Sequence, residues 1–138
     1  MDALYASISN LDSFAMYFAI SIVFLFVFKI IYAFVTPHDE WHLVKEQRSV
    51  AAAIGFGGAM VGFAIALGGA VANSQSLIDF GVWGVVAIIA QALAFAVLRF
   101  TFMPKIAERI NNDEISAGVM LAAVSIAVGL LNAACMTY

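Results

Sequence analysis

The sequence predicts an all-α integral membrane protein: a bundle of four transmembrane helices built as two parallel helix-pair repeats. The 138-residue chain is 64% hydrophobic and only 11% charged, whereas a soluble domain carries about 25% charged residues. Four long, mostly apolar runs follow one another, and about 20 such residues cross a hydrocarbon layer of about 30 Å. The basic residues, in addition, gather around two of the three connections between these runs.

The predicted spans are continuously apolar, which favours helices over the alternating strands of a membrane barrel. They are Ser13–Val35, Val50–Ala72, Phe80–Phe102 and Ile115–Thr137. The connections are a charged one at Thr36–Ser49, a short one at Asn73–Asp79 and a second charged one at Met103–Glu114. We expect residues 1–138 to form a single transmembrane domain, with one repeat at about 13–72 and the other at about 80–138.

The distribution of charge predicts the orientation. All six basic residues lie in or beside the first and third connections: Lys29, Lys45, Arg48, Arg99, Lys105 and Arg109. The other end of each span carries only Asp2, Asp12 and Asp79. Because cytoplasmic loops are enriched in Lys and Arg, we expect both charged connections to be cytoplasmic and both termini to be periplasmic. The net charge of -3 argues against nucleic acid as a partner, since phosphate binding needs a basic patch.

Sliding the chain against itself by 67 residues aligns its two halves, with Pro37 on Pro104, Ser49 on Ser116 and Gly62 on Gly129. Each half would then be a helix, an amphipathic cytoplasmic segment and a helix, which makes a parallel repeat. Chance matches among abundant Ala and Gly are the alternative interpretation.

The two cytoplasmic segments have the pattern of short helices lying in the membrane interface. In the first, Trp41, Leu43 and Val44 could face lipid. In the second, Pro104 opens a stretch whose apolar side is Ile106, Ala107 and Ile110. Two solvated loops with little structure are the alternative.

Small residues recur at helical spacing in the second and fourth spans. The helix-packing candidates are Gly55, Gly58, Gly62, Ser125, Gly129 and Ala133. Small side chains at this spacing let helix backbones approach closely in lipid. The spacing fits packing within one chain and a homo-oligomer interface equally, and a glycine-lined pore or substrate groove is a third interpretation.

Two amides, Gln91 and Asn132, lie within the third and fourth spans. Unsatisfied amides are costly in hydrocarbon, so each should face another helix. Hydrogen bonding between helices is the favoured role, and a permeation or substrate role is the alternative.

The sequence suggests no enzyme, cofactor or metal. His38 and His42 are four residues apart within HDEWH, but two histidines alone specify a metal poorly, and surface residues are the favoured interpretation. The single cysteine, Cys135, excludes an internal disulfide. Neither a Ser/His/Asp set nor a phosphate-binding loop is apparent.

The segment TPHDEW at Thr36–Trp41, the glycine-rich second span and the ending NAACMTY at Asn132–Tyr138 resemble the YjfL family of small bacterial inner-membrane proteins. The resemblance covers the whole chain and implies a multi-pass protein of the bacterial inner membrane. The family is classed as having unknown function. Its members are often encoded near an ATP-grasp enzyme similar to glutathionylspermidine synthase, which implies shared stress or envelope physiology. The second histidine is not a standard part of the family pattern, which weakens the metal interpretation.

Two functional hypotheses follow. In the favoured one, a structural or regulatory membrane protein, surrounded by lipid and homo-oligomeric, contacts a partner through its cytoplasmic segments. In the other, oligomerisation around the glycine-rich spans forms a small channel or transporter. Spans without charged midplane residues argue against a coupled transporter.

Overall fold

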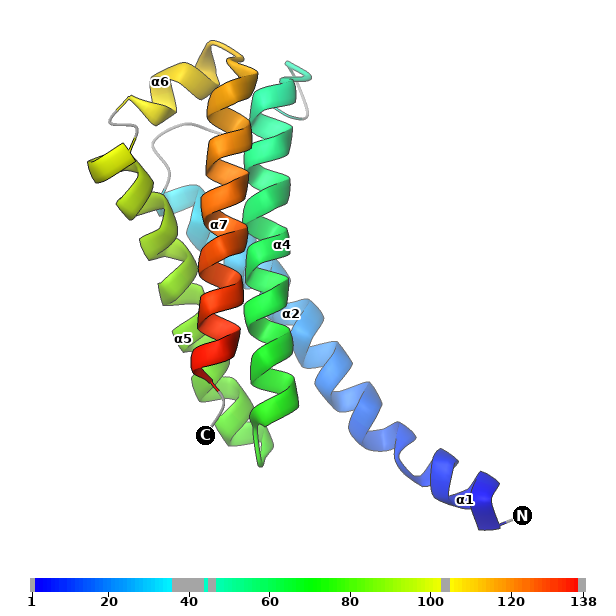
Figure 1. Ribbon diagram of the computed structural model, residues 1–138. Helices are drawn as coiled ribbons and strands as arrows, with labels where there is room; N and C mark the ends of the chain where they lie inside the picture. Colours follow the sequence, from blue (N-terminus) through cyan, green and yellow to red (C-terminus); the bar gives the residue numbers. More distant parts are fainter. Residues whose placement is uncertain (1, 36–43, 45–46, 103–104, 137–138) are drawn as a thin grey trace.

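The computed structural model describes residues 2–35, 44, 47–102 and 105–136, and this part of the chain is almost entirely helical, without strands (Figure 1). The four long helices are α2 (Leu11–Val35), α4 (Val50–Asn73), α5 (Leu77–Val97) and α7 (Ile115–Cys135). The shorter elements are α1 (Asp2–Ser9), a π-helical turn η1 (Leu98–Phe102) and α6 (Ile106–Asn111). All four long helices are long and apolar enough to cross a membrane, the first one together with α1. The predicted all-α, four-helix membrane bundle is confirmed.

The helices agree with the predicted spans to within a few residues, and α5 differs most. It begins at Leu77, three residues before the predicted start, because the Ser76 hydroxyl accepts a hydrogen bond from the N–H of Asp79 at 3.1 Å and so caps the helix. At its other end α5 gives way to η1, in which the Thr101 hydroxyl donates to the carbonyl of Val97. The predicted end of the last span, Thr137, lies outside the described residues.

Helices α4 and α7 form the centre of the bundle. They run side by side in the same direction and make the most extensive contact between any two elements described (Figure 1). Helix α5 packs in the opposite direction against both of them, while α2 packs on α4 and α5. Helix α6 and the start of α4 lie at one end of the bundle, and the α4–α5 connection lies at the other with the end of α7 (Figure 1).

Aromatic side chains attach α2 to the rest of the bundle. Phe28 stacks on Phe63 of α4 with ring centroids 4.5 Å apart. Tyr17 and Phe24 both contact Phe80 of α5, with centroids 5.3 and 5.6 Å away. Such ring pairs are each worth about 1 kcal/mol beyond the area they bury. Only 6% of the most apolar stretch of this span is buried, against 50% of that in α4, so lipid must cover most of α2.

The second charged connection contains α6, and its apolar side faces protein. Ile106 and Ile110 are completely buried in the hydrophobic core. The expectation of a helix with its apolar side on the membrane interface is therefore wrong for this segment, because the end of the bundle covers that side. In the first connection, Val44 is half-buried against the same core, whereas Trp41 and Leu43 lie outside the described residues.

The turn from α6 into α7 depends on a left-handed residue, Asp113, whose φ is 57°. The N–H of Asp113 donates to the carbonyl of Ile110 at 2.9 Å, and the N–H of Glu114 donates to the carbonyl of Arg109 at 3.0 Å. This pair of bonds is the Schellman motif, in which the left-handed position is usually a glycine. An aspartate at this position costs conformational energy, so its carboxylate needs a separate explanation.

That explanation lies at the start of α4. The carboxylate of Asp113 accepts hydrogen bonds from the N–H of Ala51 and from the hydroxyl of Ser49, both at 2.9 Å. Ser49 itself accepts from the N–H of Ala52 at 3.1 Å. The bond from Ala51, and after it the bond from Ser49, hold the pKa of Asp113 below its ordinary value of 3.8. The carboxylate thus accepts from an N–H group in the first turn of α4 that has no partner within that helix, although the two residues are 62 positions apart in the sequence.

We expect Asp113→Gly to lower the melting temperature at pH 7, although glycine suits the left-handed conformation better, because the bonds to α4 are lost. Asp113→Asn retains an acceptor and should lose less. Since the folded-state pKa is depressed, this stabilisation is present above pH 3.8 and is lost as the pH falls through the folded-state value. Thermal unfolding followed by circular dichroism measures both effects. If Asp113→Gly were as stable as wild type, the hydrogen bonds from Ser49 and Ala51 to Asp113 would not stabilise the fold as proposed.

Candidate functional site

The backbones of α4 and α7 touch each other at small residues. A side chain on Gly58 would overlap Ala122, and one on Gly62 would overlap the backbone of Ser125. Reciprocally, a Cβ on Gly129 would overlap the backbone of Gly62. Because no side chain separates the helices here, they gain the close van der Waals contact that drives helix association in lipid.

All six residues predicted to pack helices lie on this pair. Gly55 is buried on α4 and Ser125 on α7. The Cβ of Ala133, a half-buried residue, is 2.8 Å from the position that a Cβ on Gly69 would take. The sequence left open whether the small residues meet within one chain or between copies, and the structure brings Gly58, Gly62 and Gly129 into contact within one chain.

The sequence analysis missed four residues that complete this contact, namely Ala51, Gly69, Gly118 and Ala122. A Cβ on Gly118 would overlap the carbonyl of Ala51. The shift of 67 residues could have identified that pair, since it relates Ala51 to Gly118 as it relates Gly62 to Gly129. Contacts at the repeat offset are expected if a two-fold axis relates α4 and α7. The internal repeat itself remains a prediction.

Gln91, one of the two amides predicted to face another helix, lies where α5, α7 and α4 meet. Gln91 is buried on α5, and its Nε2 donates to the carbonyl of Ser125 on α7 at 3.1 Å. The same Nε2 lies 2.5 Å from the position of a Cβ on Gly62, so the absence of a side chain on α4 makes room for this bond. The Oε1 of Gln91 is buried and has no partner among the described residues. Burying this carbonyl oxygen without a hydrogen bond costs free energy, because the oxygen loses its bonds to water and gains none in the protein.

The second amide, Asn132, lies on α7 about two turns beyond Ser125. The residue is half-buried, but its Nδ2 is fully buried and has no hydrogen-bond partner in the part of the chain that the structure describes. Gln91 therefore makes the predicted helix-to-helix hydrogen bond, whereas no such bond is seen for Asn132.

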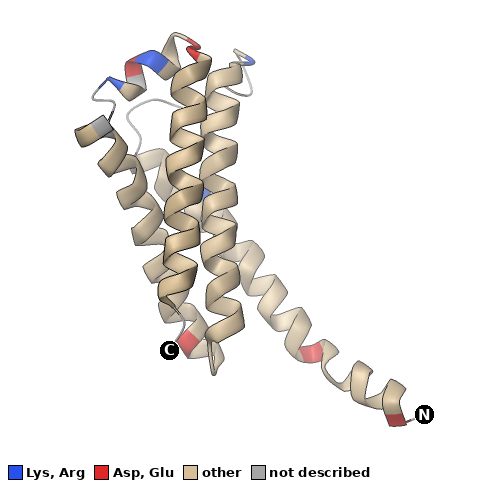
Figure 2. Ribbon diagram, viewed as in Figure 1, with Lys and Arg blue, Asp and Glu red and all other residues tan. Residues whose placement is uncertain are grey.

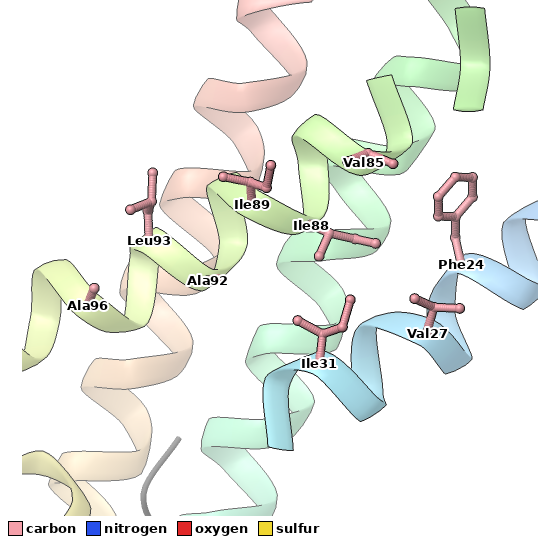
Figure 3. Close-up of a pocket in the computed structure, with 9 residues that line it drawn as sticks. All are labelled: Phe24, Val27, Ile31, Val85, Ile88, Ile89, Ala92, Leu93 and Ala96. Carbon is pink, nitrogen blue, oxygen red and sulfur yellow. The ribbon is translucent and has the colours of Figure 1, made fainter. Parts of the chain in front are cut away.

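Open apolar grooves border α2. One of about 550 Å³ lies between α2 and α5, where the side chains of Ile31, Ile88 and Leu93 help to line it (Figure 3). Another, of about 370 Å³, lies between α2 and α4 and includes Lys29 among otherwise apolar residues. Grooves of this composition suit hydrocarbon better than water or ions.

The chemistry available in the described residues is that of packing. No group of three His, Cys, Asp or Glu side chains that could hold a metal occurs among them. His38 and His42 lie outside the described residues, so the hypothesis of a histidine metal site is not tested. A close helix contact and a buried amide position helices, and neither supplies a nucleophile or a base.

Comparison with known proteins agrees with the membrane fold. Residues 5–136 match the family described as Domain of Unknown Function (DUF350). The chain is 37% identical over 131 residues to the UPF0719 inner membrane protein YjfL of Escherichia coli K12. This alignment covers 95% of the chain and 98% of that protein. Over 127 residues it is 24% identical to the UPF0719 transmembrane protein YshE of Bacillus subtilis 168, covering 91% of this chain and 94% of that one. No solved structure matches.

These relatives and the four apolar helices together identify a multi-pass protein of the inner membrane, as the resemblance of TPHDEW, the glycine-rich second span and NAACMTY implied. The relatives are named for their location and not for an activity. The chain belongs to the DUF350 family of membrane proteins, the family of YjfL.

Proposed function

We propose that this chain is a structural or regulatory protein of the inner membrane, without enzymatic activity, whose cytoplasmic segments contact a partner protein. The observation that carries the proposal is the direct backbone contact between α4 and α7 at Gly58, Gly62 and Gly129. Helices this close leave no passage between them for an ion or a polar substrate. Gln91, the amide buried at the centre of the described bundle, is bonded to the carbonyl of Ser125.

The charged end of the bundle is the surface that fits a partner. Because Ile106 and Ile110 turn inward, the polar residues of α6 turn outward, and Lys105, Glu108 and Asn111 are exposed. In Figure 2, the ribbon at this end is coloured for both basic and acidic residues. A mixed polar surface of this kind suits a reversible protein contact, whereas the sides of the long helices expose many large apolar residues and suit lipid.

We propose further that the charged end is cytoplasmic and that both termini are periplasmic. Arg48 comes just before α4, Lys105 and Arg109 lie at α6, and Asp79 lies in the first turn of α5, at the other end of the bundle from α6. The positive-inside rule supports this orientation because the connections are short.

A periplasmic reporter such as alkaline phosphatase, fused after Tyr138, should therefore be active, and the same reporter inserted after Gln47 should be inactive. A cytoplasmic reporter at the same two positions serves as the control and should give the opposite pattern. Activity of the alkaline phosphatase at Gln47 together with silence at Tyr138 would reverse the orientation.

A homo-oligomer is part of the proposal, and its contact would use a face of α4 that α7 leaves free. Gly57 and Gly68 are exposed, and a Cβ on either would meet nothing within 4 Å, although Gly68 borders a groove between α4 and α2. Ala64 lies exposed between them. The face has the small residues that allow a second helix to approach closely.

Leucine substitutions on the two faces of α4 should separate the two contacts. Gly62→Leu should destabilise the fold by about 2 kcal/mol or more, because the added atoms overlap α7 and force the helices apart. Gly57→Leu should leave the melting temperature unchanged and shift the protein to a smaller species in detergent. Thermal unfolding and light scattering measure these outcomes. Normal stability of Gly62→Leu would argue against the backbone contact, and an unchanged size of Gly57→Leu would argue against this oligomer face.

A second candidate function is an oligomeric channel or transporter. Two buried polar atoms favour it, the Oε1 of Gln91 and the Nδ2 of Asn132, which have no partners among the described residues. Water in a pathway that reached into the bundle beside these atoms would satisfy both.

Ion flux from liposomes containing the purified protein distinguishes the two functions. We expect no flux of any tested ion. We expect Gln91→Leu to lower stability by roughly 1 kcal/mol, the scale of hydrogen bonds between membrane helices, whereas Asn132→Leu removes no such bond and should not destabilise the fold. Empty liposomes and a known channel are the controls. A wild-type flux that both leucine variants abolish while remaining folded would overturn the structural or regulatory function.

A further inference from the structure

Helix α1 (Asp2–Ser9) has two faces of different chemistry. At about 100° per residue, Leu4, Ile8 and Tyr5 lie on one side of the helix, while Ser9, Asp2 and Ala6 follow one another in this order around the other side. The three apolar side chains are 59%, 76% and 51% exposed, and no residue of α1 is buried. The described chain therefore leaves the apolar side of α1 uncovered.

Helix α1 is not needed to cross the membrane. Helix α2 alone has 25 residues, which at about 1.5 Å per residue give about 37 Å. That length crosses a hydrocarbon layer of about 30 Å at inclinations of up to about 35°, and α2 is inclined relative to α4 and α7 (Figure 1). Continuing straight through α1 would carry the helix well past the membrane boundary.

A local break separates the two helices. The hydroxyl of Ser9 and the Nδ2 of Asn10 both donate to the carbonyl of Ala6, at 2.8 and 3.4 Å. Helix α2 then starts with a bond from the N–H of Phe14 to the carbonyl of Asn10. Side chains that bond to the last carbonyls of a helix allow the chain to change direction. Figure 1 shows α1 at the same end of the molecule as the α4–α5 connection and the C-terminus, displaced sideways from both.

We propose that α1 lies in the plane of the membrane interface, with Leu4, Tyr5 and Ile8 among the acyl chains of phospholipids and with Asp2 and Ser9 toward the headgroups. An amphipathic helix at the level of the membrane boundary takes this orientation, and tyrosine is enriched at that depth. The charges of this segment, Asp2 and Asp12, are acidic, so the surface suits electrically neutral phospholipids better than anionic ones. Anchored in this way, α1 helps to fix the inclination of α2, of whose most apolar stretch only 6% is buried.

Lipid fits α1 better than a second protein does. A stable protein interface buries about 800 Å² on each partner, and three side chains of an eight-residue helix offer much less. A protein surface would also have to match the two exposed aspartates, whereas headgroups and water solvate them on the polar side without further contacts.

Nitroxide labels placed singly on α1 test the proposal. The exposed Cys135 is first replaced with Ser, and Leu4→Cys, Ala6→Cys and Ile8→Cys are then labelled in vesicles of phosphatidylcholine. Collision rates with oxygen, which concentrates in lipid, and with a water-soluble nickel complex are measured by paramagnetic resonance. Labels at Leu4 and Ile8 should collide mainly with oxygen and at similar depth, while the label at Ala6, on the opposite face, should collide mainly with nickel.

Each other pattern contradicts the proposal. Equal access of nickel to Ile8 and Ala6 would place α1 in water. Low access of both reagents to Leu4 and Ile8 would mean that a protein surface, such as a second copy, covers the apolar side. A depth that changes steadily from residue 4 through 6 to 8 would mean that α1 continues the transmembrane helix. Because no residue of α1 is buried, these substitutions should leave the bundle folded.

Discussion

The contact between the bare backbones of α4 and α7 is the constraint on which the rest of the bundle depends. In lipid, apolar side chains gain little by leaving their solvent, so helices must gain stability from close packing. Gly58, Gly62 and Gly129 remove the side chains that would hold the two helices apart. The same absence of a side chain at Gly62 admits the amide of Gln91 to the carbonyl of Ser125, and this bond attaches α5 to the central pair. At the cytoplasmic end in the proposed orientation, Asp113 joins the turn before α7 to the start of α4.

Helix α2 is held by a different kind of contact. Rings such as Phe28 on Phe63 join it to the bundle, and most of its surface remains for lipid. The bundle thus has a central pair that tolerates almost no added volume and an outer helix with open apolar grooves beside it. A closed centre and a charged end support a protein that presents a surface rather than one that conducts a solute. The buried, unpaired atoms of Gln91 and Asn132 are the observation that this function leaves unexplained.

The number and position of the long helices could be predicted because each follows from a local property, a run of apolar residues long enough for the bilayer. The start of α5 was missed by three residues because it depends on a cap by Ser76. The spacing of Gly58, Gly62 and Gly129 identified them as helix-packing residues. Small residues at this spacing can pack against a helix of the same chain or of another copy, so the spacing could not show which helix they contact. The apolar side of α6 was assigned to lipid because its burial depends on how the bundle end closes. The role of Asp113 was missed because its partners are more than 60 positions away in the sequence.

The central claim is that α4 and α7 meet within one chain, and cysteine cross-linking in the membrane tests it most directly. The Cβ of Ala133 lies 2.8 Å from the position of a Cβ on Gly69, which a small relaxation brings to the 3.5–4.5 Å or so of a disulfide. In a Cys135→Ser background, Gly69→Cys with Ala133→Cys should form a bond within one chain under mild oxidation, seen as a faster monomer band before reduction. The adjacent control, Gly68→Cys with Ala133→Cys, should not, because a Cβ on Gly68 meets nothing within 4 Å. Cross-links only between chains, or equal yields from the two pairs, would contradict the account.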